Sequence, residues 1–183
     1  MMHPTSSQAA LPAPEFEVSA WLNAPGPVTL ASLRGKVVAV YAFQMLCPGC
    51  VAHAIPQAQS ISRHIGRDDL AVLGLHTVFE HHEAMNENAL RAFIHEYRIG
   101  FPVGIDRPAA RGPVPGTMAR YGMRGTPTLL LFDRGGVLRH SLFGHAPDMQ
   151  VGALLGQLLA EAAPAGCADD GCLVPPGSDA WNA

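Results

Sequence analysis

A buried strand that leads directly into a pair of cysteines limits the fold of this chain more than any other feature. Residues 36–43 (KVVAVYAF) are apolar and rich in β-branched side chains, which is typical of a strand buried on both faces of a sheet. Cys47 and Cys50 follow, and Pro48 between them favours the start of a helix. We therefore expect both cysteines at a junction where a strand ends and a helix begins.

Strand and helix patterns alternate along the rest of the chain. The helix from Pro48 should run toward Ile65 with a kink at Pro56, because proline cannot donate a hydrogen bond to the preceding turn. The other expected elements are a lead-in hairpin that turns at residues 25–27, a buried strand at 70–78, a helix at 84–97, a short edge strand at 101–105, a short helix at 117–121, a hairpin of strands 128–133 and 137–143, and an amphipathic helix at 148–162. This order predicts an α/β fold whose central mixed sheet has helices on both faces and an N-terminal hairpin extension.

The composition indicates a single domain and argues against several classes of partner. With 183 residues, 48% of them hydrophobic, the chain can bury a real core. We expect a flexible arm at residues 1–15, one domain at 16–163 and an irregular tail at 164–183. Twelve basic and fifteen acidic residues form no basic stripe for nucleic acid, and no apolar run approaches the roughly 20 residues that would span a membrane. The chain starts without the pattern of a secretory signal, so we expect a cytoplasmic location, where thiols stay reduced.

The position of the two cysteines predicts dithiol chemistry. Backbone N–H groups and the helix dipole favour negative charge at a helix start, so a thiolate at Cys47 should be stabilised. Cys50 lies one helical turn further on, within reach of a disulfide. We expect Cys47 to attack a partner disulfide and Cys50 to resolve the mixed disulfide, without a metal or organic cofactor. A structural pair, or a zinc site completed by Cys167 and Cys172, is a weaker interpretation.

Three stretches also carry a resemblance to a known family. They are LASLRGKVVAVYAFQMLCPGC, LRAFIHEYRIGFPVGID and YGMRGTPTLLLFDRGGVLRHSLFGH, in this order within residues 16–160. They are similar to the thioredoxin-like superfamily, especially its redoxin or TlpA-like thiol-disulfide oxidoreductases, which are related to the alkyl hydroperoxide reductase/thiol-specific antioxidant family. The resemblance implies a nucleophilic Cys47, a resolving Cys50, and a cis peptide bond between Thr126 and Pro127.

The same resemblance implies how a partner docks. The backbone of Thr126 would bond a substrate peptide as an added strand, while Pro127 packs against the cysteines. The apolar surface around this turn would consist of Phe43, Met45, Leu46 and Gly125. The expected partner is a disulfide-bearing protein or a small thiol or disulfide, and the protein itself is expected to be a monomer or a homodimer.

One departure from the family concerns proton transfer. Thioredoxin has a buried aspartate in the strand before its cysteines, and aligning on Cys47 puts Tyr41 there. Another group or water must then take the proton from Cys50. His76, at the end of the second buried strand, is a candidate proton relay because imidazole titrates near neutrality, and Gln44 is a second candidate for this relay. Three further histidines fit better as surface residues: His53, His81 and His82.

Three further interpretations stay open at this stage. The protein could reduce peroxides as peroxiredoxins do, although Gln44 replaces the threonine that helps to place the peroxide; its amide could donate a hydrogen bond instead. It could deliver copper without catalysis, although copper-delivery relatives space their cysteines one residue further apart and add a histidine. Cys167 and Cys172 could form a second redox pair that passes electrons to the first.

Overall fold

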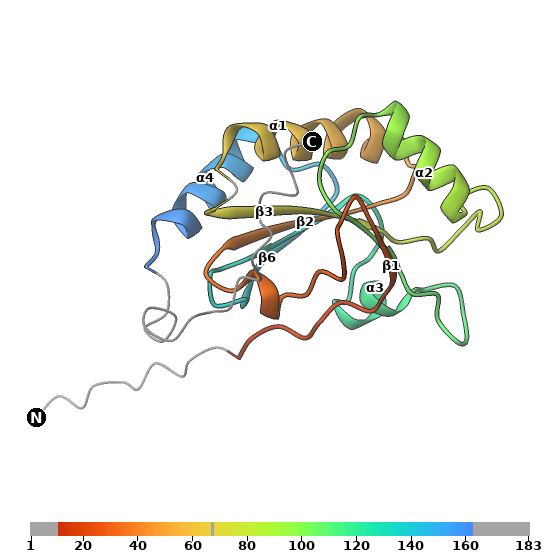
Figure 1. The fold of residues 1–183 in the computed structure, drawn as a ribbon, viewed down its shortest axis with the longest axis horizontal. Coiled ribbons are helices and arrows are strands. Elements are labelled where there is room, and N and C mark those ends of the chain that lie inside the picture. The colour runs from red at the N-terminus through yellow and green to blue at the C-terminus, as the bar shows by residue number, and fades with distance from the viewer. Residues whose placement is uncertain (1–10, 67, 163–183) are drawn as a thin grey trace, which may run out of the picture.

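The computed structural model describes residues 11–66 and 68–162, and its centre is a six-stranded sheet (Figure 1). The strands are β1 (Val18–Leu22), β2 (Val37–Phe43), β3 (Leu70–His76), β4 (Val103–Asp106), β5 (Thr128–Phe132) and β6 (Leu138–Phe143), in the order β1-β4-β3-β2-β5-β6. β2, β3 and β4 are parallel to one another, whereas β1, β5 and β6 pair in antiparallel fashion. The predicted mixed α/β sheet is confirmed.

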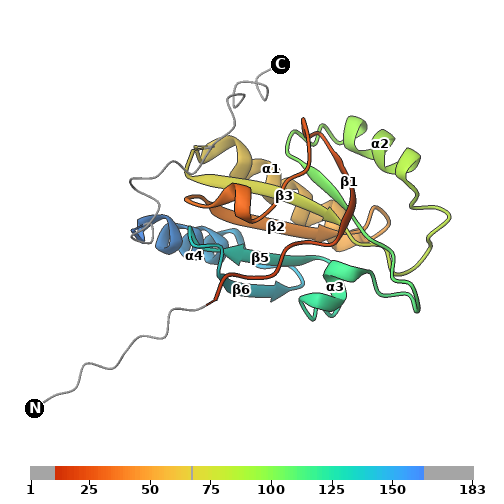
Figure 2. The same cartoon turned by 60° about the horizontal axis from the view of Figure 1, so that its bottom comes forward.

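Helices cover both faces of this sheet (Figures 1 and 2). Helices α1 (Ile55–His64), α2 (Glu87–Glu96) and α4 (Asp148–Ala160) lie on one face, while α3 (Gly116–Arg120) and the 3₁₀ turn η1 (Ala31–Leu33) lie on the other. Every residue of β2 is buried, because alternate side chains enter the apolar clusters on the two faces. The sequence predicted this from the unbroken apolar run. No helix in the described part of the chain is long and apolar enough to cross a membrane.

Two strand predictions at the edge of the sheet are wrong. β1 does not form a hairpin with a following strand; it pairs with β4, with Leu22 opposite Val103. β4 is therefore an internal strand, and β1 takes the edge position that the sequence assigned to residues 101–105. Pro102 is tolerated because it precedes β4, where its carbonyl accepts a hydrogen bond from the Gly74 N–H at 2.8 Å and no proline N–H is required.

The helix that carries the cysteines starts at Pro48 and contains a π-helical stretch, η2 (Cys50–Ala54), before it continues as α1. Pro56 lies in the first turn of α1 and has no N–H to donate to the turn before it. The chain widens there, and the Ile55 N–H donates to the carbonyl of Cys50. The irregularity expected at Pro56 thus takes the form of a π-helical turn directly after the dithiol.

A buried carboxylate anchors the segment that leads to the Thr126–Pro127 turn. Asp106, at the end of β4, accepts hydrogen bonds from the backbone N–H groups of Thr117 and Met118 at 2.8 and 3.0 Å, and from the Thr77 hydroxyl at 2.8 Å. Burial raises the pKa of Asp106. These bonds fix the first turn of α3, from which the chain continues to residues 125–127.

Candidate active site

Cys47 and Cys50 lie at the carboxyl end of β2, where the strand passes into the helix. Cys47 is partly exposed, Cys50 is fully buried, and both are free thiols. The Cys47 N–H donates to the carbonyl of Gln44 at 3.2 Å, which tightens the turn after β2. The Cys50 N–H donates to the Cys47 sulfur at 3.3 Å. Such a donor stabilises negative charge on the outer sulfur, as a reactive thiolate requires.

The turn that contains Pro127 packs against this pair. The peptide bond between Thr126 and Pro127 is cis, as the resemblance implied. The Cys47 sulfur lies 3.5 Å from the carbonyl oxygen of Thr126. A Cβ added at Gly49 would lie 3.4 Å from Cδ of Pro127, so the proline ring is in contact with the loop between the cysteines. The Gly144 N–H, next to β6, donates to the Pro127 carbonyl at 2.8 Å and holds the turn from its other side.

The inner thiol is held in its protonated form. Burial is the largest cause that raises the pKa of Cys50, and the neighbouring Cys47 thiol adds to it, giving about 12. The backbone N–H of Gln44 and the hydroxyl of Thr126 act in the opposite direction. The sulfur of Cys50 is therefore both buried and protonated at neutral pH, and its surroundings must change before it can attack. The sulfur that a partner can reach is that of Cys47.

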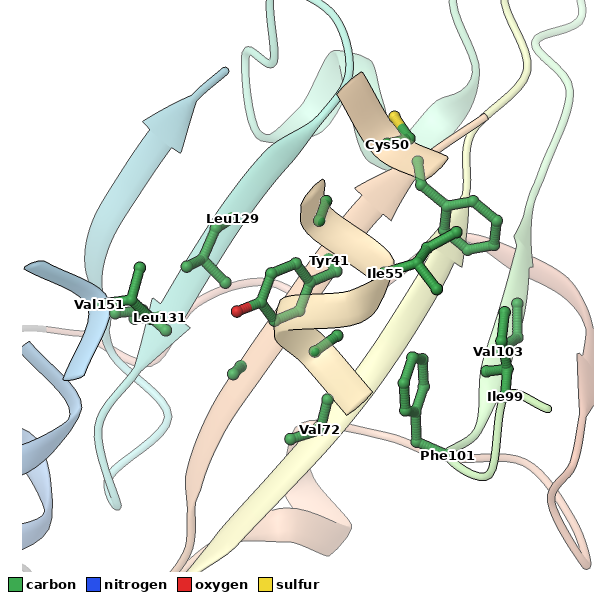
Figure 3. Packing of buried hydrophobic residues seen from close by; sticks show 14 of the residues in the cluster. Tyr41, Cys50, Ile55, Val72, Ile99, Phe101, Val103, Leu129, Leu131 and Val151 are labelled. Carbon is green, nitrogen blue, oxygen red and sulfur yellow. The ribbon is translucent and has the colours of Figure 1, made fainter. Parts of the chain in front are cut away.

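Tyr41 stands where thioredoxin has its buried aspartate. Its hydroxyl donates to Oε1 of Gln57 at 3.0 Å, and burial, followed by the charge of Asp148, raises its pKa. In Figure 3 this hydroxyl points toward Leu131 and away from Cys50. Tyr41 thus offers no base to the inner thiol.

His76 lies at the end of β3 and is almost fully buried. Its ring centroid is 5.4 Å from that of Phe43, the residue opposite it on β2. Within the described residues its Nε2 has no hydrogen-bond partner, and desolvation lowers its pKa to about 4. A neutral ring of this kind is a weak base, and the relay role assigned to His76 stays a prediction.

Gln44 is buried at the end of β2 and connects three segments of the site. Its Nε2 lies 3.4 Å from Oε1 of Glu80 and 3.5 Å from the hydroxyl oxygen of Thr126. Its Oε1 accepts a hydrogen bond from the Phe79 N–H at 3.4 Å. The side chain is thus engaged within the protein, and a peroxide at this point would have to displace one of these contacts. The sequence did not indicate this role.

The surface around the dithiol differs in part from the expectation. Leu46 is 58% exposed beside Cys47, but Phe43 and Met45 are core residues, so the prediction that they form a docking surface is wrong. Gly125 is buried under the ring of Phe143, which is 51% exposed and was missed. A sequence signal for Phe143 exists: it follows Leu142 at the end of a strand, where alternation turns one of two adjacent apolar residues outward.

The remaining candidates lie apart from the sulfurs or outside the described residues. His81 and His82 are exposed on the segment after β3, as expected. His53 is also exposed, and its ring centroid is 4.5 Å from that of His145. Cys167 and Cys172 fall outside the described residues, so the predicted second redox pair and the tail at 164–183 stay predictions.

Comparisons with known proteins show the family and the fold of this chain. Residues 10–141 match the model of the AhpC/TSA family. A solved structure of a thioredoxin-like superfamily protein is 56% identical with a TM-score of 0.82, over 85% of this chain and 100% of that one. The structure of a thiol-disulfide isomerase from Corynebacterium glutamicum is 48% identical with a TM-score of 0.80, over 82% of this chain and 97% of that one.

A curated relative extends well beyond this chain. Protein DipZ from Mycobacterium bovis is 32% identical over 155 residues, which are 83% of this chain but 21% of that protein. The chain thus spans about a fifth of the length of the curated relatives that it matches.

Proposed function

Because this chain belongs to the AhpC/TSA family and has a thioredoxin-like fold, we propose that it is a thiol-disulfide oxidoreductase that uses Cys47 and Cys50 as its redox-active pair. Its similarity to a thiol-disulfide isomerase supports a disulfide substrate in a protein. Relatives of this kind support a redox enzyme in general, and the geometry of the site supports the assignment of the two sulfurs.

The reaction proceeds in two exchange steps. The Cys47 thiolate attacks one sulfur of the partner disulfide; a bond forms between Cys47 and that sulfur, and the other partner sulfur leaves as a thiolate. Cys50 then gives up its proton and attacks the Cys47 sulfur, which breaks the mixed disulfide and releases the second partner thiolate. The partner gains two electrons and two protons in all, and the protein is left with a Cys47–Cys50 disulfide. A dithiol reductant restores it.

One observation carries this proposal: the Cys50 N–H donates to the sulfur of Cys47, which is the only one of the two sulfur-bearing residues with access to solvent. This arrangement stabilises the attacking thiolate and keeps the resolving thiol shielded until a mixed disulfide has formed. The cis turn at Pro127 adds a surface where a partner chain can lie beside Cys47.

The test supplies insulin disulfides and hydrogen peroxide in parallel, with dithiothreitol as the reductant. We expect wild type to accelerate insulin reduction, Cys47→Ser to be inactive, and Cys50→Ser to accumulate a mixed disulfide that mass spectrometry detects. Fast peroxide consumption without insulin reduction would instead support the peroxidase alternative. Titration of the reduced protein with Cu(I) addresses the copper carrier, because a carrier should retain a stoichiometric metal ion and show no turnover.

A further inference from the structure

An exposed aromatic ring covers the turn next to the dithiol. Phe143, the last residue of β6, is 51% exposed, and its Cε2 lies 3.0 Å from where a Cβ on Gly125 would be. Gly125 precedes Thr126, whose carbonyl oxygen is 3.5 Å from the Cys47 sulfur. The ring of Phe143 thus forms an apolar surface over Gly125, the residue before the one whose carbonyl oxygen contacts the Cys47 sulfur.

A cation lies over this ring. The guanidinium carbon of Arg124 is 4.9 Å from the centroid of Phe143, a cation–π contact. Arg124 is exposed and forms no ion pair with any described residue. Four arginines of the described chain do pair with a carboxylate, namely Arg91, Arg120, Arg134 and Arg139, whereas Arg34, Arg63, Arg98, Arg107 and Arg111 form no such ion pair either. What distinguishes Arg124 is its position: its positive charge lies over an exposed aromatic ring, two residues before the carbonyl that contacts the Cys47 sulfur.

A partner chain bound at the turn must pass this charge. A peptide that lies along the Thr126 backbone as an added strand advances about 3.3 Å per residue. The side chains on one flank of its cysteine then come beside Arg124 and Phe143, while Leu46, 58% exposed, lies on the Cys47 side. This surface combines exposed apolar groups with the positive charge of Arg124 beside Phe143, while the exposed carboxylate of Glu80 lies on the Gln44 side, 3.4 Å from Nε2 of Gln44. On the Arg124 flank, the surface fits a segment with an apolar residue and a carboxylate close to its cysteine.

We propose that Arg124, held over Phe143, makes the protein prefer polypeptide disulfides that carry an acidic residue near the reacting cysteine. This inference rests on the proposed function, since it names the class of disulfide that Cys47 attacks. Arg124 and Phe143 act as specificity determinants: they contact the partner's flanking residues and leave the exchange of sulfur bonds to the cysteines. One rim charge against a partner carboxylate in water should change the second-order rate constant by roughly fivefold to tenfold.

The test uses disulfide dimers of one short peptide with Glu, Gln or Lys two residues before or after its cysteine. Reduction under dithiothreitol turnover is followed by chromatography, and the rate with Cys47→Ser is subtracted as background. With wild type we expect kcat/KM for the Glu peptide to exceed that for the Lys peptide by roughly tenfold at low salt, and the ratio to shrink at high salt. Glu is placed either before or after the cysteine, and the position that raises kcat/KM more identifies the flank of the peptide that contacts Arg124.

Variants separate a local contact from a general charge effect. Arg124→Gln should bring the values of kcat/KM for the three peptides within about twofold of one another. Arg124→Lys, which keeps the charge but not the planar group, and Phe143→Leu, which removes the aromatic face, should each leave a reduced preference. Arg63→Gln is the matched control, since Arg63 is exposed in the last turn of α1, about 24 Å along the helix from Cys47, and its loss should leave the preference intact.

The outcomes distinguish the two proposals. If wild type reduces all three peptides above background at equal rates, or if Arg124→Gln keeps the preference, the selectivity inference is wrong although the oxidoreductase function stands. If no peptide is reduced faster than with Cys47→Ser, the proposed function itself fails, and the inference fails with it.

Discussion

The hydroxyl of Tyr41 donates a hydrogen bond to Oε1 of Gln57 at 3.0 Å inside the core, and Gln57 extends the connection to α4. Its Nε2 donates to the Ala146 carbonyl at 2.9 Å and to Oδ1 of Asp148 at 2.7 Å. This chain of bonds joins β2, α1 and the start of α4 beneath the dithiol. At the position where thioredoxin has a carboxylate, this protein therefore has a structural contact.

Replacing the tyrosine separates a structural role from a catalytic one. Tyr41→Phe leaves Oε1 of Gln57 without its buried donor, so we expect the free energy of unfolding to fall by about 1–3 kcal/mol. The rate of insulin reduction should stay within about twofold, because the hydroxyl points away from Cys50 (Figure 3). Urea unfolding and the insulin assay measure the two effects. A tenfold loss of rate with unchanged stability would instead assign Tyr41 to proton transfer.

His76 should make the stability of the protein depend on pH. Its pKa is lowered from 6.5 to about 4 in the folded state, so the unfolded chain binds a proton in this range while the folded protein does not. The contribution is complete above pH 6.5 and is lost as the pH falls toward 4, by roughly 3 kcal/mol in all. Urea unfolding of wild type at pH 7, 6, 5 and 4 measures this loss.

The control for this prediction is His76→Leu, which removes the titrating ring. Between pH 6.5 and 4 its stability should fall less steeply than that of wild type, since only the carboxylates and other histidines then titrate. Nε2 of His76 has no hydrogen-bond partner among the described residues, so the leucine leaves no donor or acceptor unpaired there. Parallel pH curves for the two proteins would show that the wild-type slope has another origin.

Periodicity predicted the elements of this fold because each strand and helix has its own apolar pattern. The run at residues 36–43 identified β2, and the spacing of Leu90, Phe93 and Ile94 identified α2. The same pattern contains no information on which strands become neighbours. β1 pairs with β4, which lies some 80 residues further along the chain, so a local turn at residues 25–27 wrongly suggested a hairpin.

The candidate site was predictable only where a residue type carries its own chemistry. The cysteine pair stands out by spacing, and the cis turn by its likeness to a family. The contacts of Gln44 and Phe143 could not be predicted in this way, because they join distant segments: Gln44 meets Glu80 and Thr126, and Phe143 meets Gly125. The prediction that Phe43 lies on the docking surface was wrong for a related reason. A residue close to Cys47 in the sequence can still have its side chain buried under a helix.

Gln44 should support the rate of thiol-disulfide exchange, because its side chain connects the segments that form the site. Gln44→Ala removes the amide that bridges the segment after β3 and the cis turn, and it leaves the Phe79 N–H without its acceptor. We expect a loss of about 1–3 kcal/mol in unfolding free energy and faster amide hydrogen exchange at residues 77–80 and 124–128. The rate of insulin reduction should fall several-fold. If amide hydrogen exchange in both segments is as slow in Gln44→Ala as in wild type, this bridging role is wrong.

The order of the two thiols can be tested by alkylation. A variant with Cys167→Ser and Cys172→Ser retains two of the four cysteines of the chain, Cys47 and Cys50. In the reduced native protein at pH 8, we expect iodoacetamide to modify Cys47 alone, because Cys50 is fully buried and burial raises its pKa to about 12. Intact-mass and peptide mass spectrometry should show one added group in the folded state and two in guanidinium chloride.

The result of this alkylation determines the direction of the proposed chemistry. If Cys50 reacts as fast as Cys47 in the folded protein, the inner sulfur is accessible and ionised, and the assignment of attacking and resolving thiols reverses. Adding Cys47→Ser to the variant gives the control, since it should leave a native protein that resists iodoacetamide until it unfolds. Its Cys50 should become reactive over the same range of denaturant in which the fold is lost, because Cys50 is a fully buried member of the core cluster.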